Sequence, residues 1–107
     1  MTTPLGEKIR ALRKEKRMTL DALSERAGMS KSYLWELENR ESPRPSAEKL
    51  SALAGALGMP ASYFIDKDVS APEEHHLDEA FFRNYRQLDT DDKERLRRIL
   101  ETFRNDD

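Results

Sequence analysis

Apolar residues recur every three or four positions along most of the chain, which is the spacing of one face of an α-helix. Before residue 66 this pattern predicts five helices, each with one buried stripe. The expected inward residues, in chain order, are Leu5, Ile9 and Leu12; Leu23 and Ala27; Leu34 and Leu37; Leu50, Leu53, Ala54 and Leu57; and Phe64 or Ile65. The pattern therefore predicts a small all-α domain.

Capping and helix-breaking residues separate these stripes. The first helix is expected from about Leu5 to Lys16, and Pro60 suits the first turn of the fifth. The segment "NRESPRPS" predicts a loop, because each proline disfavours helical geometry in the residue before it and lacks a backbone N–H. The expected N-caps are Thr19, Ser30 and Ser46, and the expected glycine ends are Gly28 and Gly58.

Beyond the first domain, residues 1–66, the chain changes character. Residues 67–75 are acidic, lack apolar periodicity and contain Pro72, so we expect a linker. Residues 76–107 carry two further apolar stripes and predict a helical hairpin. Its second helix is expected to be capped by Thr90 or Asp91, with Asp91 and Glu94 spaced as a capping box.

The hairpin is expected to bind another surface, because two helices alone bury too little apolar surface to be stable. The N-terminal domain, a second copy of the chain and a different protein are all candidate surfaces. Half of the aromatic residues lie in this short tail, and interfaces favour aromatic anchors. We therefore favour self-association. The expected dimer interface consists of Leu77, Phe81, Tyr85, Leu88, Leu96, Ile99, Leu100 and Phe103.

The formal net charge of −2 hides a split between the two parts of the chain. Residues 1–65 contain 11 Lys and Arg against 8 Asp and Glu, a net charge of +3. Residues 66–107 contain 8 against 13, a net charge of −5. A basic first part suits a phosphate-rich partner even though the whole chain is acidic.

Several classes of protein are disfavoured. There is no cysteine for a disulfide or a Cys-based zinc site, and no apolar run approaches the roughly 20 residues of a membrane span. The first ten residues lack the apolar region of a signal peptide, so a cytoplasmic location is expected. His75 and His76 are interpreted as ordinary solvated histidines, because no third ligand with suitable spacing is evident. We expect neither a cofactor nor a metal, and no catalytic constellation indicates an enzyme.

A helix from Thr19, a turn through "AGMS" and a helix from Ser30 follow the order of a helix-turn-helix. The run "LSERAGMSKSYLWELE" resembles the lambda-repressor-like (XRE, Cro-type) family of bacterial and phage regulators, and the resemblance spans about residues 5–65. It implies a five-helix DNA-binding domain, here followed by the hairpin, in a protein of the bacterial cytoplasm that joins the nucleoid when bound to DNA.

The resemblance also implies roles for individual residues. The helix from Ser30 is expected to enter the major groove. The loops and the N-terminal ends of the helices beside it are expected to contact phosphates. The expected base contacts are Lys31, Ser32, Tyr33, Trp35 and Glu36, and the expected phosphate contacts are Thr19, Arg40, Arg44 and Ser42, with Arg10, Lys14 and Lys16 as weaker candidates. For Tyr33, packing on the domain and contact with a phosphate are about equal alternatives. Glu36 would repel phosphates unless Lys31 neutralises it or a cytosine N4 satisfies it.

Two further positions follow from the same resemblance. The family usually has a glutamine at the start of the second helix, where this chain has Leu20, so the phosphate contact of that glutamine is absent or comes from Thr19. Arg13 and Glu38 match a buried ion pair between the first and third helices, which makes Glu38 part of the scaffold.

These expectations lead to two hypotheses. The first is a DNA-binding transcription regulator, a repressor that occupies a two-fold operator as a homodimer. The second is a protein-interaction module, such as an antitoxin, or a regulator whose tail binds a protein antagonist. A partner gene nearby or a co-purifying protein would favour the second.

Overall fold

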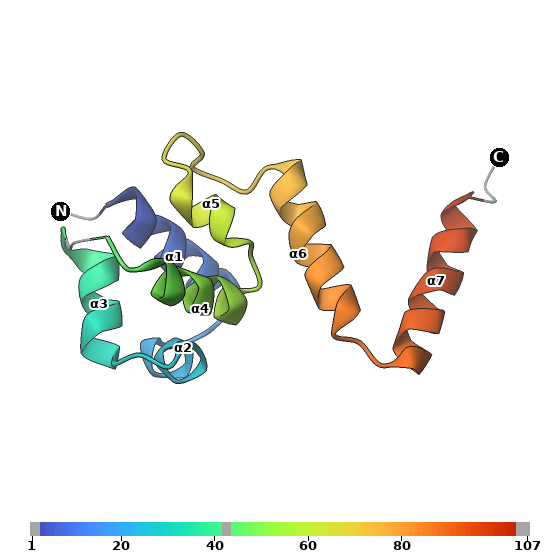
Figure 1. The fold of residues 1–107 in the computed structure, drawn as a ribbon, viewed down its shortest axis with the longest axis horizontal. Coiled ribbons are helices and arrows are strands. Elements are labelled where there is room, and N and C mark those ends of the chain that lie inside the picture. The colour runs from blue at the N-terminus through green and yellow to red at the C-terminus, as the bar shows by residue number, and fades with distance from the viewer. Residues whose placement is uncertain (1–2, 42–43, 105–107) are drawn as a thin grey trace.

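The computed structural model describes residues 3–41 and 44–104, and the secondary structure in these ranges is entirely helical. Helices α1 to α5 form a packed body, and α6 and α7 extend from it (Figure 1). The helices are α1 (Pro4–Glu15), α2 (Leu20–Ala27), α3 (Lys31–Asn39), α4 (Ala47–Leu57), α5 (Ala61–Ile65), α6 (Glu74–Arg86) and α7 (Thr90–Arg104). The all-α fold, with five helices before residue 66, is confirmed.

Side-chain caps begin the first four helices. The hydroxyl oxygens of Thr3, Thr19, Ser30 and Ser46 each accept a hydrogen bond from the backbone N–H three residues later, at 3.0 to 3.2 Å. The three caps expected from the sequence are confirmed, and Thr3 starts α1 one residue before the expected position. Gly28 and Gly58 end α2 and α4 in the left-handed conformation, as predicted.

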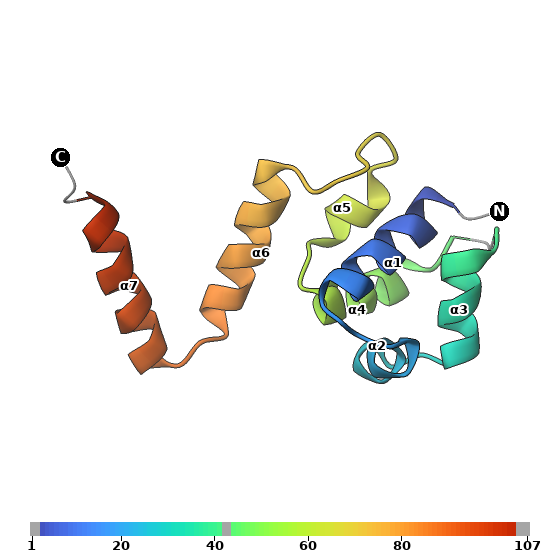
Figure 2. The same cartoon turned by 180° about the vertical axis from the view of Figure 1, so that it is seen from behind.

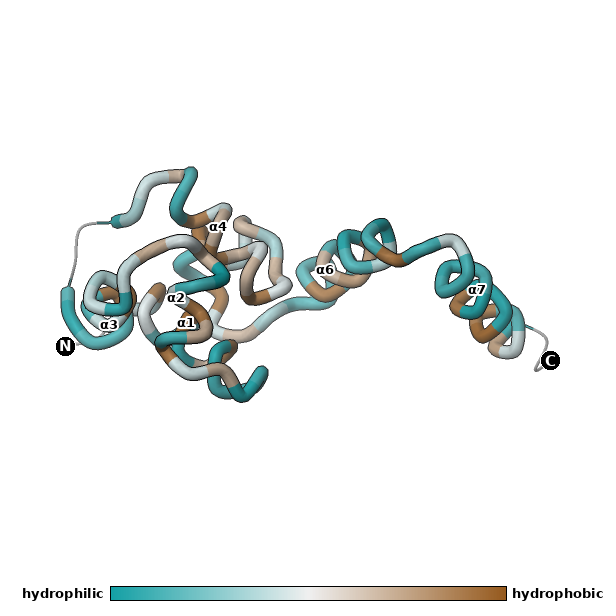
Figure 3. Tube along the Cα trace, turned by 90° about the horizontal axis from the view of Figure 1, so that it is seen from below, coloured by the Kyte–Doolittle hydropathy of each residue, from teal (hydrophilic) through white to brown (hydrophobic). Residues whose placement is uncertain are grey.

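The core is formed by the apolar stripes of α1 to α5. Ile9, Leu23, Leu34, Leu53 and Leu57 are fully buried at its centre. In α5, Tyr63 and Phe64 are buried and Ile65 is half exposed, so Phe64 takes the inward position that the sequence left open between Phe64 and Ile65. Figure 3 shows apolar segments both within this body and along α6 and α7.

Lys8 is an unexpected member of the interior, with only 4% of its surface exposed. Its ammonium donates to the carbonyl of Tyr63 at 2.7 Å and to the carbonyl of Asp66. It also lies 4.6 Å from the centre of the Tyr63 ring. Burial lowers the pKa of Lys8, because removal from water disfavours its charged form. These contacts tie α1 to the end of α5.

The sixth helix packs on the body through a small set of side chains. Ala80 joins the edge of the core, and the buried ring of His76 packs edge-on against Tyr63 with the ring centres 5.2 Å apart. The guanidinium of Arg83 lies over Gly55 of α4, so close that a methyl group at Gly55 would come within 2.9 Å of it. Because α6 begins at Glu74, the last two residues of the expected linker are helical.

The seventh helix stands apart from the body, and none of its described residues is buried. Figures 1 and 2 show α6 and α7 as an open V that meets only at the connecting turn. The carboxylate of Asp89 caps α7 by accepting from the N–H of Asp92 at 2.8 Å. The expected cap at Thr90 or Asp91 is therefore wrong, because Asp89 is the residue whose side chain reaches the first turn.

The protein is elongated, with extents of 51 × 28 × 23 Å and a radius of gyration of 16.1 Å. A compact chain of this length has a radius of gyration of about 13 Å. In the part of the chain that the structure describes, no helix combines the length and the apolar character needed to span a membrane.

Candidate nucleic-acid interface

Helices α2 and α3 form a helix-turn-helix. The N–H of Met29 bonds to the carbonyl of Ser24, and Gly28 adopts φ of +68°, which turns the chain sharply after α2. Ser30 then starts α3. Leu23 and Leu34 are both fully buried in the core, and this burial fixes the orientation of α3 on the body. On its other side, α3 carries side chains that are exposed to solvent.

Four of the five side chains expected to contact bases lie together on this outer side. Lys31, Ser32, Trp35 and Glu36 are exposed and, with Arg40, line a shallow hollow of about 340 Å³. We call these five residues the reading face. They share one side of α3 because positions three and four apart in a helix are neighbours. Leu34 and Leu37 occupy the opposite, buried side.

Trp35 is the large apolar member of the reading face, with 42% of its surface exposed. The guanidinium carbon of Arg40 lies 5.2 Å from its ring centre, within the range of a cation–π contact. The carbonyl of Trp35 accepts from the Asn39 amide at 2.9 Å. The ring thus holds Arg40 at the edge of the hollow.

Tyr33 lies outside the reading face. It is half-buried, packs against the core, and has the ammonium of Lys49 at 4.3 Å from its ring centre. Tyr33 therefore packs on the domain, and its expected contact with DNA stays a prediction. Lys49, in the first turn of α4, is a neighbour of α3 that sequence analysis missed.

Lys31 forms an ion pair across the helix-turn-helix. Its ammonium is 3.3 Å from the carboxylate of Asp21, and both side chains are largely exposed. The sequence pointed to Glu36 as the partner of Lys31 and gave no indication of Asp21. Both groups of this ion pair are exposed to solvent, so breaking the pair costs little free energy.

The residues expected to contact phosphates are distributed around α3. Thr19 stands exposed at the start of α2, where its hydroxyl is occupied by the cap of that helix. Arg40 follows α3, and Arg44 precedes α4 with one guanidinium N–H donating to the carbonyl of Ile65 at 3.2 Å. Ser42 lies outside the described residues. The weaker candidates Arg10 and Lys14 are exposed on α1, and Lys16 is exposed at its C-cap.

The ion pair expected between α1 and α3 is present. Two guanidinium N–H groups of Arg13 donate to the two carboxylate oxygens of Glu38 at 2.7 and 2.9 Å, and a third donates to the carbonyl of Met18 at 2.9 Å. The hydrogen bonds to Glu38 raise the pKa of Arg13. Leu20 packs partly buried against the core, so the first position of α2 supplies no polar side chain to the interface.

Gly6 brings α1 against the end of α3. A Cβ at this position would lie 2.3 Å from the carbonyl oxygen of Leu37, so only a residue without a side chain fits here. Sequence analysis missed this contact, because a single glycine inside a helical pattern carries no indication of what it approaches.

The histidines at the start of α6 differ from the sequence interpretation. His75 is exposed, but His76 is buried, and its Nδ1 accepts from the N–H of Glu73 at 3.0 Å. The interpretation of His76 as solvated is therefore wrong. Glu73, His75 and His76 also place one ligand atom each within 4.8 Å of one another, so a third candidate ligand exists. The positive end of the helix dipole and the engaged Nδ1 both oppose a cation there.

The expected interface residues of the tail are mostly exposed. The exposed members are Leu77, Phe81, Leu88, Ile99, Leu100 and Phe103, and Tyr85 and Leu96 are half-buried. Within the V, Lys93 and Arg97 of α7 lie 5.5 and 5.8 Å from the ring centre of Tyr85. Phe82 is a further exposed aromatic residue that the sequence-based set omitted.

Comparisons with known proteins agree with this architecture. Residues 4–62 match a family described as helix-turn-helix domain. The immunity repressor protein of Bacillus phage phi105 is 40% identical over 70 residues, 65% of this chain and 48% of the repressor, so the chain spans about half the length of that relative. The HTH-type transcriptional regulator SinR of Bacillus subtilis (strain 168) is 31% identical over 74 residues, 69% of this chain and 67% of SinR.

Solved structures that are similar to the chain include two that contain SinR. A crystal structure of SinR, described as the master regulator for biofilm formation, in complex with DNA covers 58% of this chain and 98% of that chain, with 34% identity and a TM-score of 0.55. A complex of the SinR and SinI proteins covers 94% of both chains with a TM-score of 0.58, and at 23% identity it shows the fold alone. The chain belongs to the lambda-repressor-like helix-turn-helix family of transcription regulators.

Proposed function

We propose that this protein is a sequence-specific DNA-binding transcription regulator that inserts α3 into the major groove. The observation that carries the proposal is the reading face, five exposed side chains around one hollow on a helix whose other side is anchored in the core. Similar proteins include an immunity repressor and a regulator solved in complex with DNA, which supports the same function.

The reading face offers distinct chemistry to base edges. In the proposed complex Lys31 donates to guanine O6 or N7, and Ser32 bonds either a base or a phosphate. Glu36 accepts a hydrogen bond from the amino group at cytosine N4. At a G·C pair this amino group is the donor that the major groove exposes to a carboxylate. Trp35 supplies an apolar surface for a thymine methyl group. Lys31 must leave Asp21 to reach a base, which an exposed pair permits.

Phosphate contacts flank the reading face in the proposal. Arg40 and Arg44 carry positive charge toward the DNA backbone. Thr19 donates its hydroxyl proton, which the capping hydrogen bond does not use, and Ser42 completes the predicted set. Each phosphate that a cation neutralises adds about 0.9 to the slope of log K against log salt. Tyr33 acts through packing, and its neighbour Lys49 is an additional candidate for a phosphate.

The tail is proposed to form a homodimer, so that two copies of α3 address half-sites about 34 Å apart on one face of the DNA. The exposed apolar residues of α6 and α7 support this, because a lone V of two helices leaves them in water. A dimer that covers a promoter represses transcription by occupancy.

Selection of bound sites from a random DNA library tests the proposal. We expect a two-fold sequence motif and an affinity that falls steeply with salt. Replacement of Lys31 and Ser32 together by alanine should reduce specific binding by about tenfold or more, since bidentate and polar base contacts carry discrimination. The matched control is Lys93→Ala with Thr102→Ala on α7. Failure to enrich any motif, or equal affinity of the two double variants, would reject the proposal.

A second candidate function concerns the same tail. The exposed aromatic residues Phe81, Phe82 and Phe103 would equally suit a different protein, such as an antagonist or a toxin. Sedimentation of the purified full chain discriminates the two. A monomer that co-purifies with a stoichiometric second protein from its own host favours the partner, and a dimer of the pure chain favours self-association.

A further inference from the structure

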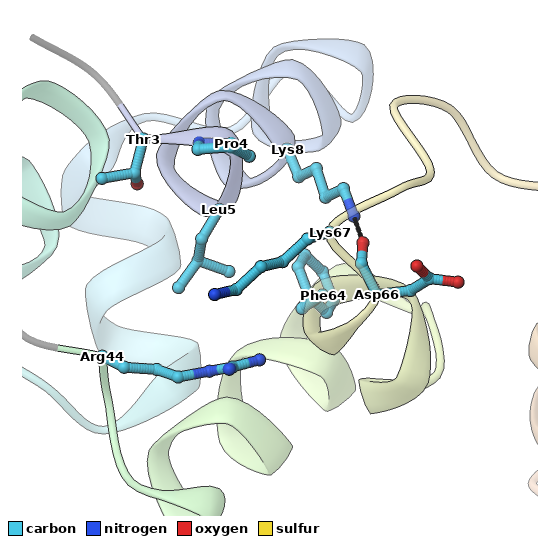
Figure 4. A pocket seen from close by; sticks show the side chains of 8 residues that line it. All are labelled: Thr3, Pro4, Leu5, Lys8, Arg44, Phe64, Asp66 and Lys67. Carbon is cyan, nitrogen blue, oxygen red and sulfur yellow. Dashed lines mark hydrogen bonds between the residues drawn. The ribbon is translucent and has the colours of Figure 1, made fainter.

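A pocket of about 270 Å³ lies away from the reading face, between the start of α1, the end of α5 and the loop before α4. Leu5 and Phe64 form its apolar wall, and the side chains of Arg44 and Lys67 extend across it from opposite sides (Figure 4). Lys8 closes one end. Its size is near the lower limit of small-molecule sites, which is about 300 Å³.

The charge of this pocket is unbalanced. In the described residues no ion pair involves Lys8, Arg44 or Lys67. The one acidic side chain in the lining, Asp66, points away from the two long cations in Figure 4, and its Oδ1 accepts from the N–H of Asp68 at 3.0 Å. The ammonium of Lys8 is already bonded to the carbonyls of Tyr63 and Asp66. The pocket thus presents two cations, Arg44 and Lys67, beside an apolar wall, and the Asp66 carboxylate is not turned toward either of them.

This combination selects one class of ligand. An anionic group would meet Arg44 and Lys67, whose guanidinium and ammonium bind carboxylates with charge-assisted hydrogen bonds. A ring or short acyl chain would cover Leu5 and Phe64, which gains the free energy of burying apolar surface. A cation would be repelled, and a bare anion would leave the apolar wall uncovered.

Arg44 is both a lining residue of this pocket and an expected phosphate contact. Its guanidinium donates to the carbonyl of Ile65 at 3.2 Å, so it already lies at the pocket wall. A carboxylate in the pocket would hold Arg44 there and compete with a DNA phosphate for the same guanidinium. We propose that the pocket binds a small organic carboxylate with an apolar body, and that its occupancy weakens DNA binding through Arg44. The effect on DNA rests on the proposed function, whereas ligand binding does not.

The first experiment measures ligand binding without DNA. The full-length protein, labelled with ¹⁵N, is titrated with phenylacetate, with neutral phenylacetamide and with inorganic phosphate. We expect saturable amide shifts at Leu5, Phe64 and Lys67 with phenylacetate, and affinities about tenfold weaker with the other two probes. Lys67→Gln should weaken phenylacetate binding about fivefold, and the exposed Lys14→Gln should not.

Several results would overturn this binding site. These are the absence of saturable shifts with phenylacetate, equal affinity for phenylacetamide, or equal affinity of Lys67→Gln and Lys14→Gln. Equal binding of inorganic phosphate would identify a simple anion site and reject the amphipathic ligand.

The second experiment measures DNA affinity on a selected site in sodium phenylacetate and in sodium acetate at equal ionic strength. We expect saturating phenylacetate to weaken DNA binding about threefold, and DNA to weaken phenylacetate binding by the same factor, because coupling is reciprocal. Arg44→Gln should bind DNA more weakly and no longer respond. Unchanged DNA affinity in the presence of bound phenylacetate would reject the regulatory effect. If the protein does not bind DNA at all, the proposed function is rejected. The phenylacetate titration then decides by itself whether the pocket is a ligand site.

Discussion

At the scale of single residues, the ion pair of Arg13 and Glu38 fixes α3 on the body. Glu38 is 1% exposed and accepts two hydrogen bonds from one guanidinium. We expect Glu38→Ala to reduce the free energy of unfolding by about 3 kcal/mol, because Arg13 is left without its counter-charge. Urea denaturation measures this. The double variant Arg13→Met with Glu38→Leu should lose much less, and an equal loss in both variants would contradict a charge-based cost.

Two glycines should respond differently to alanine. In Gly6→Ala the new Cβ meets the backbone oxygen of Leu37 at 2.3 Å, which α1 can relieve only by moving away from α3. We expect a loss of about 3 kcal/mol or more in the free energy of unfolding. Gly28 has no atom within 4 Å of a new Cβ, so Gly28→Ala meets only the strain of its φ of +68°. That loss should be about 1 kcal/mol. Thermal unfolding of both variants checks the order.

Exposure of single residues was predictable only where periodicity decides it. Trp35 follows from the spacing of Leu34 and Leu37, which occupy the inward side of α3. The burial of Lys8 does not follow from any local pattern, because its acceptor on Tyr63 is 55 residues away in sequence. The burial of His76 likewise depends on a ring that belongs to α5. Polar residues are buried when distant carbonyls or rings satisfy them, and a single sequence does not display those partners.

At the scale of elements, α2 restrains the reading face of α3 through Asp21. This carboxylate neutralises Lys31 and would lie near DNA phosphates in the proposed complex. We expect Asp21→Asn to raise DNA affinity about threefold, because Lys31 is released and a repulsive charge is removed. Fluorescence anisotropy with a selected site measures the change.

The control for this variant is Glu25→Gln, which removes an exposed charge of the same sign from the same helix. If both variants raise the affinity equally, the effect is one of net charge, and the specific role of the pair with Lys31 is rejected.

Helix boundaries were predictable where one residue alone could act as the cap. Thr19, Ser30 and Ser46 are each the single suitable residue before an apolar stripe, and each forms the expected hydrogen bond. Before α7 the chain offers Asp89, Thr90 and Asp91 in succession, and the sequence pattern does not choose among them. The structure uses Asp89. The start of α7 was therefore ambiguous because adjacent residues could each act as the cap, and not because the segment has a weak helix propensity.

At the scale of the whole molecule, the layout of a body followed by two helices was predictable, but the docking of α6 was not. The sequence predicts the hairpin as one unit, and the N-terminal domain is only one of three candidate surfaces for it. In the structure Ala80, His76 and Arg83 attach α6 to the body, and α7 has no buried residue. The three attachment sites include a histidine and an arginine, which no hydrophobic pattern marks as inward.

The unburied apolar faces of α6 and α7 lead to the last prediction. Phe81 and Ile99 are 52% and 53% exposed, which leaves apolar surface in water on both arms of the V. We expect the full chain to sediment as a dimer at micromolar concentration, and Phe81→Glu with Ile99→Glu to sediment as a monomer, since buried charges oppose association. The matched control is Asn84→Glu with Arg98→Glu, which places two glutamates on the same helices at residues outside the expected interface.

The same variants connect the tail to DNA. A monomer retains the reading face but loses the second α3, so its affinity for a two-fold site should fall by about a hundredfold, because the second half-site no longer binds as part of the same complex. Its affinity for a single half-site should be unchanged. If the glutamate pair at Phe81 and Ile99 left the dimer intact, the interface would lie elsewhere on the chain. If the wild-type chain were already a monomer that binds two half-sites independently, the exposed faces of α6 and α7 would have to serve a different protein.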